Sequence, residues 1–169
     1  MSIIKTKDTT QIYYKDWGKL VSSIDAVARS RLLTINVDAL LVDVAKLLSD
    51  TQISLVVVCD SDGAMVGVIT KTNIVQQFGR CGESACTTVA ADVMTREVAR
   101  EVAYCRPTDS LPDVLSMMEK RGFVHIPVVD ENSKPSGVVN ARDALRALMA
   151  EEKYEASLLR DYVMGIGYR

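Results

Sequence analysis

The stretch GVITKTN at residues 67–73 returns as GVVNARD at residues 137–143, 70 positions later. Each copy has a glycine, two β-branched residues, a polar residue, two further residues and then Asn or Asp. A β-branched run predicts a strand, and polar residues with this spacing are typical of a helix start. Each copy therefore predicts a strand that turns directly into a helix, and the repetition decides the fold.

The repeat extends well beyond the turn. Residues 33–75 align with residues 103–145 without a gap. The identical residues fall in the first predicted helix, in the second and third predicted strands and in the turn between these strands. They are Leu41/Leu111, Asp43/Asp113, Val44/Val114, Val58/Val128, Asp60/Asp130, Gly67/Gly137 and Val68/Val138. Such a repeat indicates one structural unit present twice.

Each copy predicts the order strand, helix, strand, strand, helix. The first copy places these elements at 32–37, 40–48, 53–59, 65–70 and from Lys71 onward, and the second at 102–107, 111–118, 123–129, 135–140 and from Ala141 onward. Ser110, Pro112 and Asp113 favour a helix start at that point. Three strands and two helices leave one sheet face bare, so we expect the units to pack sheet against sheet.

The connection between the copies, residues 79–101, opens with glycines and then turns helical. Beyond Asp143 an apolar stripe predicts a long C-terminal helix, which lies either on its own domain or against a second subunit. The stripe comprises Leu145, Leu148, Met149, Leu158, Leu159, Tyr162 and Val163.

Composition narrows the function. The 169 residues carry a net charge of −2 with pI near 5.5, which argues against nucleic acid or an anionic membrane as a partner. Neither a secretory h-region nor a membrane span is present, so we expect a cytoplasmic protein. The four cysteines are expected to be unbridged, and with one histidine in the chain we expect no metal site. Catalytic motifs are lacking, so we predict no enzyme activity.

The second turn has the chemistry of a nucleotide site. Backbone N–H groups at the start of the helix can receive a phosphate, and Arg142 can add a charged fork. Asp143 can accept two hydrogen bonds from a ribose diol, and Phe123 and Tyr104 can pack on a base. The alternative is purely structural, because Asn140 and Asp143 also have the spacing of a capping box, as do Thr70 and Asn73.

The element order, ADVMTREV at 91–98, HIPVVD at 125–130 and the doubled turn together resemble a cystathionine-β-synthase (CBS) domain pair, or Bateman module. The resemblance covers about residues 30–150. It implies an α+β fold in which two β-α-β-β-α repeats pack as a pseudo-two-fold pair. The implied division is an N-terminal extension (1–29), CBS motif 1 (30–79), a linker with a short helix (80–101), CBS motif 2 (102–150) and a C-terminal helix and tail (151–169).

The resemblance also implies a function. Such modules bind adenine nucleotides (AMP, ADP, ATP or an NAD-type dinucleotide), and we expect AMP, no metal, a homodimer and an unidentified protein target. The stronger site is predicted at Asp143, Asn140, Arg142, Ala141, Tyr104, Phe123, Val124, His125 and Pro127. The weaker site is predicted at Thr70, Lys71, Thr72, Asn73, Ile53, Ser54 and Leu55. The alternative function is an interaction scaffold with degenerate sites.

Both copies depart from the family motif, which has Thr or Ser and then Asp at its polar positions. The first copy keeps Thr70 but has Asn73, and the second keeps Asp143 but has Asn140. The family's Arg before the histidine is Val124 here, and His125 is either half-buried with its nitrogens satisfied or a ligand contact. Residues 1–18 resemble the opening hairpin of haloperoxidase- and esterase-type α/β-hydrolases, whose catalytic residues have no counterpart in the chain.

Overall fold

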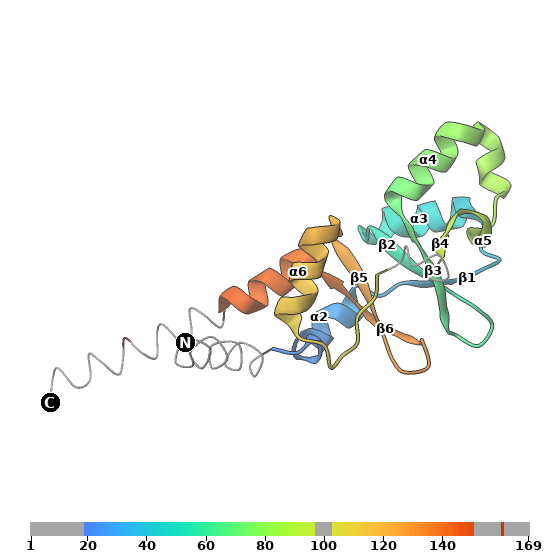
Figure 1. Ribbon diagram of the computed structural model, residues 1–169. Coiled ribbons are helices and arrows are strands. Elements are labelled where there is room, and N and C mark those ends of the chain that lie inside the picture. Colours follow the sequence, from blue (N-terminus) through green and yellow to red (C-terminus); the bar gives the residue numbers. More distant parts are fainter. Residues whose placement is uncertain (1–18, 97–102, 151–159, 161–169) are drawn as a thin grey trace, which may run out of the picture.

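The structure is a computed structural model that describes residues 19–96, 103–150 and 160. Its first half contains β1 (Thr34–Asn36), α3 (Leu41–Thr51), β2 (Leu55–Cys59), β3 (Met65–Thr70) and α4 (Lys71–Cys81). The second contains α6 (Leu111–Arg121), β5 (His125–Val129), β6 (Pro135–Asn140) and a helix over residues 141–150. Figure 1 shows the hairpin β2–β3 with α3 and α4 on one side and the hairpin β5–β6 with α6 on the other.

The two hairpins have the same register. Leu55 pairs with Thr70 in the first, and His125 pairs with Asn140 in the second. Each ladder shifts at the same place, between Val58 and Cys59 and between Val128 and Val129. The parallel pairing of Ile35 with Val58 is matched by an isolated bridge from Cys105 to Val128. The predicted strand at 102–107 is reduced to this bridge among the described residues.

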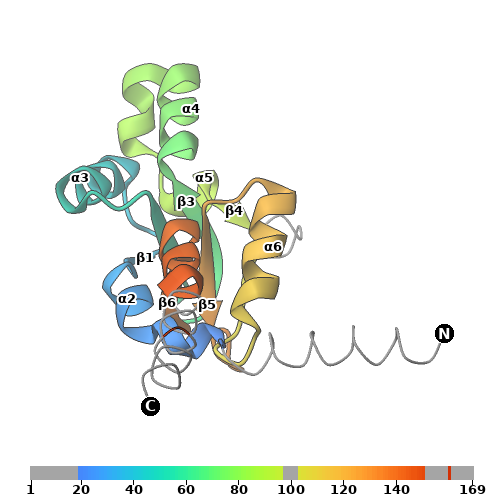
Figure 2. The ribbon, with the colours of Figure 1, turned by 90° about the vertical axis from the view of Figure 1, so that its left-hand side faces the viewer.

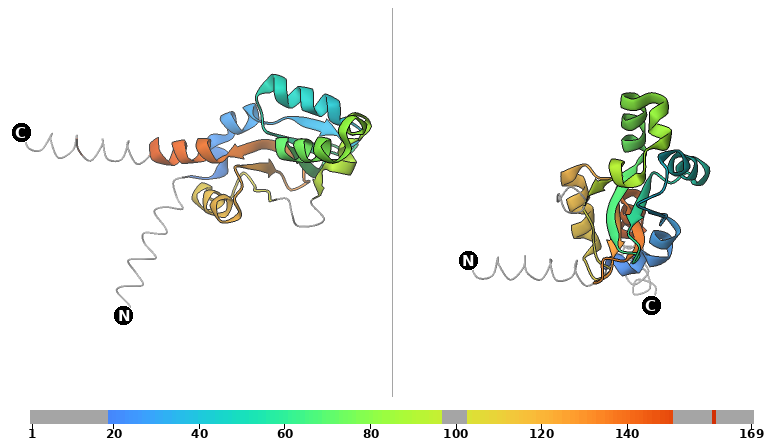
Figure 3. Two further views of the ribbon diagram at one scale, coloured as in Figure 1. Left: turned by 90° about the horizontal axis from the view of Figure 1, so that it is seen from above. Right: turned by 90° about the vertical axis from the view of Figure 1, so that its right-hand side faces the viewer.

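Both faces of each hairpin are buried, as the uninterrupted apolar runs predict. In β2, Val56 and Val58 face the helices of their own half, while Leu55, Val57 and Cys59 pack with Val129 and Val138 of the other half. The sheets therefore pack against each other, and a backbone bond of 2.8 Å from Met65 N–H to the Ser133 carbonyl joins their tips. The left view of Figure 3 shows α3 and α4 at one end of the molecule and the helix of residues 141–150 at the other.

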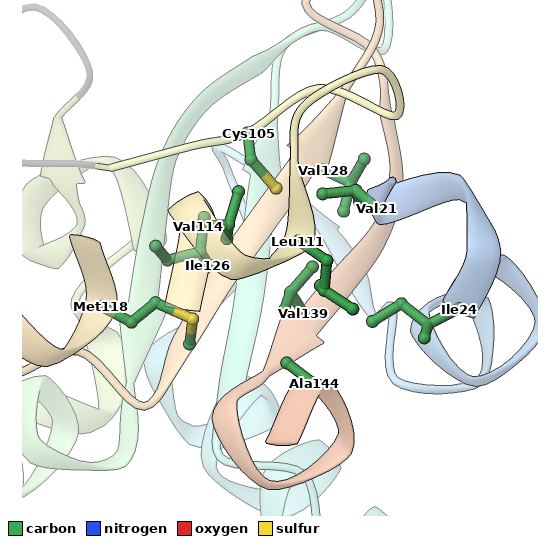
Figure 4. Close-up of a cluster of buried hydrophobic side chains, with 10 residues drawn as sticks. All are labelled: Val21, Ile24, Cys105, Leu111, Val114, Met118, Ile126, Val128, Val139 and Ala144. Carbon is green, nitrogen blue, oxygen red and sulfur yellow. The ribbon is translucent and has the colours of Figure 1, made fainter. Parts of the chain in front are cut away.

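The segment that precedes each repeat packs on the opposite repeat. η1 (Val21–Ile24) and α2 (Asp25–Ser30) lie in the second half, where Val21 and Ile24 join a core with Leu111 of α6, as Figure 4 shows. Figure 2 shows the helix of residues 141–150 between α2 and α6. Val21 and Ile24, which lie within the predicted N-terminal extension, thus belong to the hydrophobic core of the second half.

The connection between the halves contains η2 (Gly82–Thr87), α5 (Ala90–Val93) and a short strand, β4 (Thr95–Arg96), that the sequence did not predict. β4 pairs antiparallel with β3. This pairing explains the glycine of the first turn, because a Cβ on Gly67 would lie 2.6 Å from the Thr95 carbonyl oxygen. A Cβ on Gly137 would lie 2.9 Å from the Cβ of Ala28 in α2. Both glycines are required by a neighbouring backbone segment.

The helix termini also repeat. α3 ends at Gln52 with φ 59°, and α6 ends at Gly122 with φ 70°, two left-handed C-caps at equivalent positions. α6 begins at the predicted place, and there the Ser110 side chain accepts a hydrogen bond from the backbone N–H of Asp113. Within the described ranges, no helix is long and apolar enough to cross a bilayer. The predicted C-terminal helix beyond residue 150 lies almost entirely outside the described residues.

Candidate functional site: two clefts between the halves

Two clefts open between the halves, one at each copy of the repeated turn. The first cleft, at the start of α4, has a volume of about 620 Å³, within the roughly 300–1,000 Å³ typical of small-molecule sites. The first half lines it with Ser54, Leu55, Val68, Thr70, Lys71, Thr72 and Asn73. The remaining lining residues are Thr95, Ala103, Gly122, Phe123, Val124, His125 and Pro127.

The second cleft, at the start of the helix of residues 141–150, is smaller, with a volume of about 250 Å³. It is lined by Arg31, Gln52, Ile53, Ser54, Leu55, Val124, His125, Val138, Asn140 and Arg142. The two clefts share the starts of β2 and β5: Ser54, Leu55, Val124 and His125. They are therefore neighbours on either side of a common wall.

At the first turn, Thr70 and Asn73 form a reciprocal capping box. The backbone N–H of Asn73 donates to Thr70 Oγ1 at 3.2 Å, and the backbone N–H of Thr70 donates to Asn73 Oδ1 at 2.9 Å. The Thr70 hydroxyl also donates to Asn73 Oδ1, at 2.9 Å. This bears out the capping interpretation for the first turn. It leaves the exposed side chains of Lys71 and Thr72 at the cleft, beside the positive end of an 11-residue helix.

The second turn is built differently. Asn140 Oδ1 accepts a hydrogen bond from the backbone N–H of Arg142 at 2.8 Å. In a capping box the donor would be the next backbone N–H, that of Asp143. The carboxylate of Asp143 instead forms a bidentate ion pair with Arg31, whose Nε and Nη2 donate to its two oxygens. The capping box predicted for Asn140 and Asp143 is thus replaced by a tertiary ion pair across 112 positions of sequence.

The Arg31–Asp143 pair is largely sheltered from water. The Asp143 side chain is 6% exposed and that of Arg31 is 35% exposed. Asp143 is the one charged residue that is buried within the described part of the chain. The hydrogen bond to Asp143 raises the pKa of the Arg31 guanidinium above its usual value, although burial acts in the opposite direction.

His125 is half-buried in the wall that separates the clefts. Burial lowers its pKa, and the nearby positive charge of Arg31 lowers it further, while Asp143 acts in the opposite sense. The Asn140 amide nitrogen lies 2.9 Å from His125 Nε2. Because the amide nitrogen can only donate, Nε2 accepts and the neutral ring carries its proton on Nδ1. This fits the interpretation of His125 as half-buried with a satisfied nitrogen. The His125 side chain also lines both clefts.

The structure brings the predicted residues together in a different grouping. Each turn faces strand residues of both repeats: Phe123 and Pro127, predicted to accompany Asp143, lie at the first cleft with Thr70. Ile53, predicted to accompany Thr70, lies at the second cleft. Ser54, Leu55, Val124 and His125 line both.

Three predicted residues stand apart from the cleft linings. Asp143 lies behind Arg31. The backbone N–H of Ala141 donates to the Val124 carbonyl at 2.9 Å, and Tyr104 is 40% exposed with the Arg106 guanidinium 5.9 Å from its ring centre. Sequence reasoning also missed Arg31, since nothing in its local sequence indicates a partner near the second turn. In the described ranges, no group of three or more His, Cys, Asp or Glu side chains could hold a metal ion.

The profile of the CBS domain family matches residues 21–79 and 89–150, well over half of the chain. The chain belongs to the CBS domain family. It is a tandem CBS pair, or Bateman module, with the α+β fold that the repeat predicts. None of the findings supports the hydrolase resemblance of residues 1–18, which lie outside the described residues.

Relatives of this CBS pair include short proteins and parts of larger enzymes. The chain is 23% identical over 148 residues to an uncharacterized 17.7 kDa protein of Acidianus ambivalens, covering 88% of this chain and 86% of that protein. It is 32% identical over 123 residues to the arabinose 5-phosphate isomerase GutQ of Salmonella typhi, covering 73% of this chain but 35% of the isomerase. It therefore spans about a third of that enzyme, in its CBS part.

Two solved structures with the same fold contain adenosine derivatives. CBSX2 of Arabidopsis thaliana, in complex with AMP, superposes with a TM-score of 0.67 at 20% identity, covering 80% of this chain and 99% of that one. The CBS pair of protein MJ0100, in complex with 5′-methylthioadenosine and S-adenosylmethionine, superposes with a TM-score of 0.65 at 22% identity, covering 79% and 98%. At these identities the likeness shows the fold alone.

Proposed function

We propose that this CBS pair is a regulatory module that binds an adenine nucleotide, AMP in particular, in the first cleft. The observation that carries the proposal is the combination of cleft size, apolar walls and a helix N-terminus in one place. Leu55, Val68 and Phe123 offer apolar surface for a base, and Lys71 with the start of α4 offers positive charge for a phosphate.

Charge favours a phosphate-bearing ligand over a cationic one. Lys71 lines the first cleft, and no acidic side chain is among the described residues that do so. CBSX2 is solved with AMP and MJ0100 with S-adenosylmethionine, whose sulfonium is positive. A positive helix end and a lysine disfavour a sulfonium, so AMP is the better fit.

Regulation would follow from where the ligand sits. The first cleft is walled by Thr70 and Lys71 from one half and by Phe123 from the other. A ligand that contacts both halves stabilises the arrangement in which both contacts are made. This would change the surface offered to a second subunit or to a protein target.

The proposal is tested by thermal unfolding with AMP, ADP, ATP, NAD and S-adenosylmethionine. A ligand at 100 times its dissociation constant adds about 2.7 kcal/mol to the free energy of unfolding. We expect AMP to raise the melting temperature, and Lys71→Ala to reduce that rise. The matched variant is Thr72→Ala, which removes a second exposed side chain from the same helix turn without removing charge.

An interaction scaffold with degenerate sites is the second candidate function. It is favoured by the capping box of Thr70 and Asn73 and by the Arg31–Asp143 pair, since both turns are satisfied without a ligand. The scaffold predicts no change in melting temperature with any member of the panel.

A further inference from the structure

We propose that Arg31 excludes a nucleoside from the second cleft, so that one chain binds a single nucleotide, in the first cleft. This rests on the proposed function, because it assigns the stoichiometry and the specificity of the same module. The sequence favours the second turn, which retains the carboxylate, whereas the geometry makes that carboxylate inaccessible.

The first step concerns the acceptors of Asp143. Arg31 engages both carboxylate oxygens, and Nη2 lies 2.9 Å from Oδ1. Only 6% of the Asp143 side chain is exposed. Arg31 itself lines the second cleft, so the guanidinium lies between the cleft and the carboxylate.

The second step compares the bonds that would be exchanged. A ribose diol reaching Asp143 would replace two charge-assisted bonds from a guanidinium with two bonds from neutral hydroxyls. The hydroxyl bonds would also be charge-assisted, because the carboxylate is ionised, but the exchange gives up the attraction between two opposite charges and is therefore unfavourable. It would also leave Arg31 without its buried partner.

The third step concerns space. The second cleft measures about 250 Å³ against about 620 Å³ for the first. Asn140, whose hydroxyl-bearing counterpart is Thr70, is already bonded to His125 and to the backbone N–H of Arg142. At the first turn Asn73 occupies the position of Asp143, and its cleft contains Lys71 in place of an arginine ion pair.

Calorimetric titration of the full chain with AMP tests the inference. We expect one AMP per chain in the wild type, an affinity loss of about tenfold for Lys71→Ala, and less than about a twofold change for Arg142→Ala, which truncates an exposed side chain at the second cleft. Arg31→Met removes the guanidinium and should raise the stoichiometry to two. Adding Asp143→Asn to Arg31→Met should return it to one, because the neutral amide offers the ribose diol one acceptor oxygen in place of the two oxygens of the carboxylate.

Two AMP molecules per wild-type chain, or a single one whose affinity depends on Arg142 and not on Lys71, would overturn the inference; both readouts use variants that keep the ion pair. One AMP in the first cleft of both wild type and Arg31→Met overturns the role of Arg31 and leaves the proposed function standing. Binding by Arg31→Met but not by wild type supports the role of Arg31 and overturns the proposed site in the first cleft.

Discussion

Loss of the Arg31–Asp143 pair is expected to weaken the fold as well as to open the second cleft. Removing one partner of a fully buried ion pair costs about 3–5 kcal/mol, because the other charge is left without compensation. Arg31 is 35% exposed, so water can reach the gap left by Arg31→Met. We therefore expect a reduced cost of about 2–3 kcal/mol in the free energy of unfolding.

Asp143→Asn should cost less, about 1–2 kcal/mol, because the freed guanidinium can turn toward water. The double variant should cost less than the sum of the two single variants, with a coupling free energy of about 1–3 kcal/mol. Urea unfolding at pH 7, followed by circular dichroism, measures all four proteins of the cycle.

The chain contains a matched control for this cycle. Arg29 and Asp25 form an ion pair one helical turn apart in α2, with side chains 70% and 48% exposed. Arg29→Met should lower the free energy of unfolding by no more than about 0.5 kcal/mol. If Arg31→Met costs no more than Arg29→Met, or if the two single variants of the Arg31–Asp143 cycle are additive, the pair does not stabilise the fold as described.

Three further predictions concern other residues. Gly67→Ala and Gly137→Ala should each lower the free energy of unfolding by about 1–3 kcal/mol, because the new Cβ meets the Thr95 carbonyl or Ala28. Gly79→Ala is the control: it has open space around it in α4 and should raise the free energy of unfolding by about 0.5–1 kcal/mol. Equal melting temperatures for the three variants would contradict the packing. The pKa of His125 is lowered in the folded state. Its contribution to stability is therefore present above about pH 6.5 and is lost as the pH falls toward the pKa of the folded protein. His125→Gln should flatten this part of the plot of unfolding free energy against pH, and an unchanged slope would refute the prediction. Burial raises the pKa of Cys105 to about 12 and that of Cys59 above its usual value. A thiol reagent at pH 8 should therefore label exposed Cys81 and half-buried Cys86 first. Rapid labelling of Cys105 in the folded protein would contradict its burial.

The sequence predicts the repeated elements because the repeat has no gap. The offset of 70 places Leu55 and Thr70 against each other as it places His125 and Asn140, and even the irregularity after Val58 recurs after Val128. Apolar runs identify β2 and β5 as buried strands. The packing of η1, α2 and β4 is harder to predict, because no local pattern tells which half each segment will cover. Only Gly67 and Gly137 indicate that another stretch of backbone comes close.

The site could be predicted only in part. The turns are local features, so Thr70, Asn73, Asn140 and Arg142 could be placed at helix starts from their spacing. The composition of each cleft depends on the pseudo-two-fold packing, which brings Phe123 to Thr70 and Ile53 to Asn140. The Arg31–Asp143 pair joins residues 112 positions apart, and neither neighbourhood signals the other.

The predicted homodimer stays a prediction. Val75 of α4 is 70% exposed, and Leu145 and Met149 of the helix of residues 141–150 are 50% and 47% exposed. Such side chains are candidates for a subunit contact.

The most direct test of the central claim is the location of AMP bound to the wild-type chain. The chain has two phenylalanines, Phe78 and Phe123, and only Phe123 lines the first cleft among the described residues. In protein with labelled phenylalanine rings, we predict nuclear Overhauser contacts between the adenine protons of AMP and the ring of Phe123. Saturable AMP binding without adenine contacts to Phe123, or no binding at all, would contradict the account.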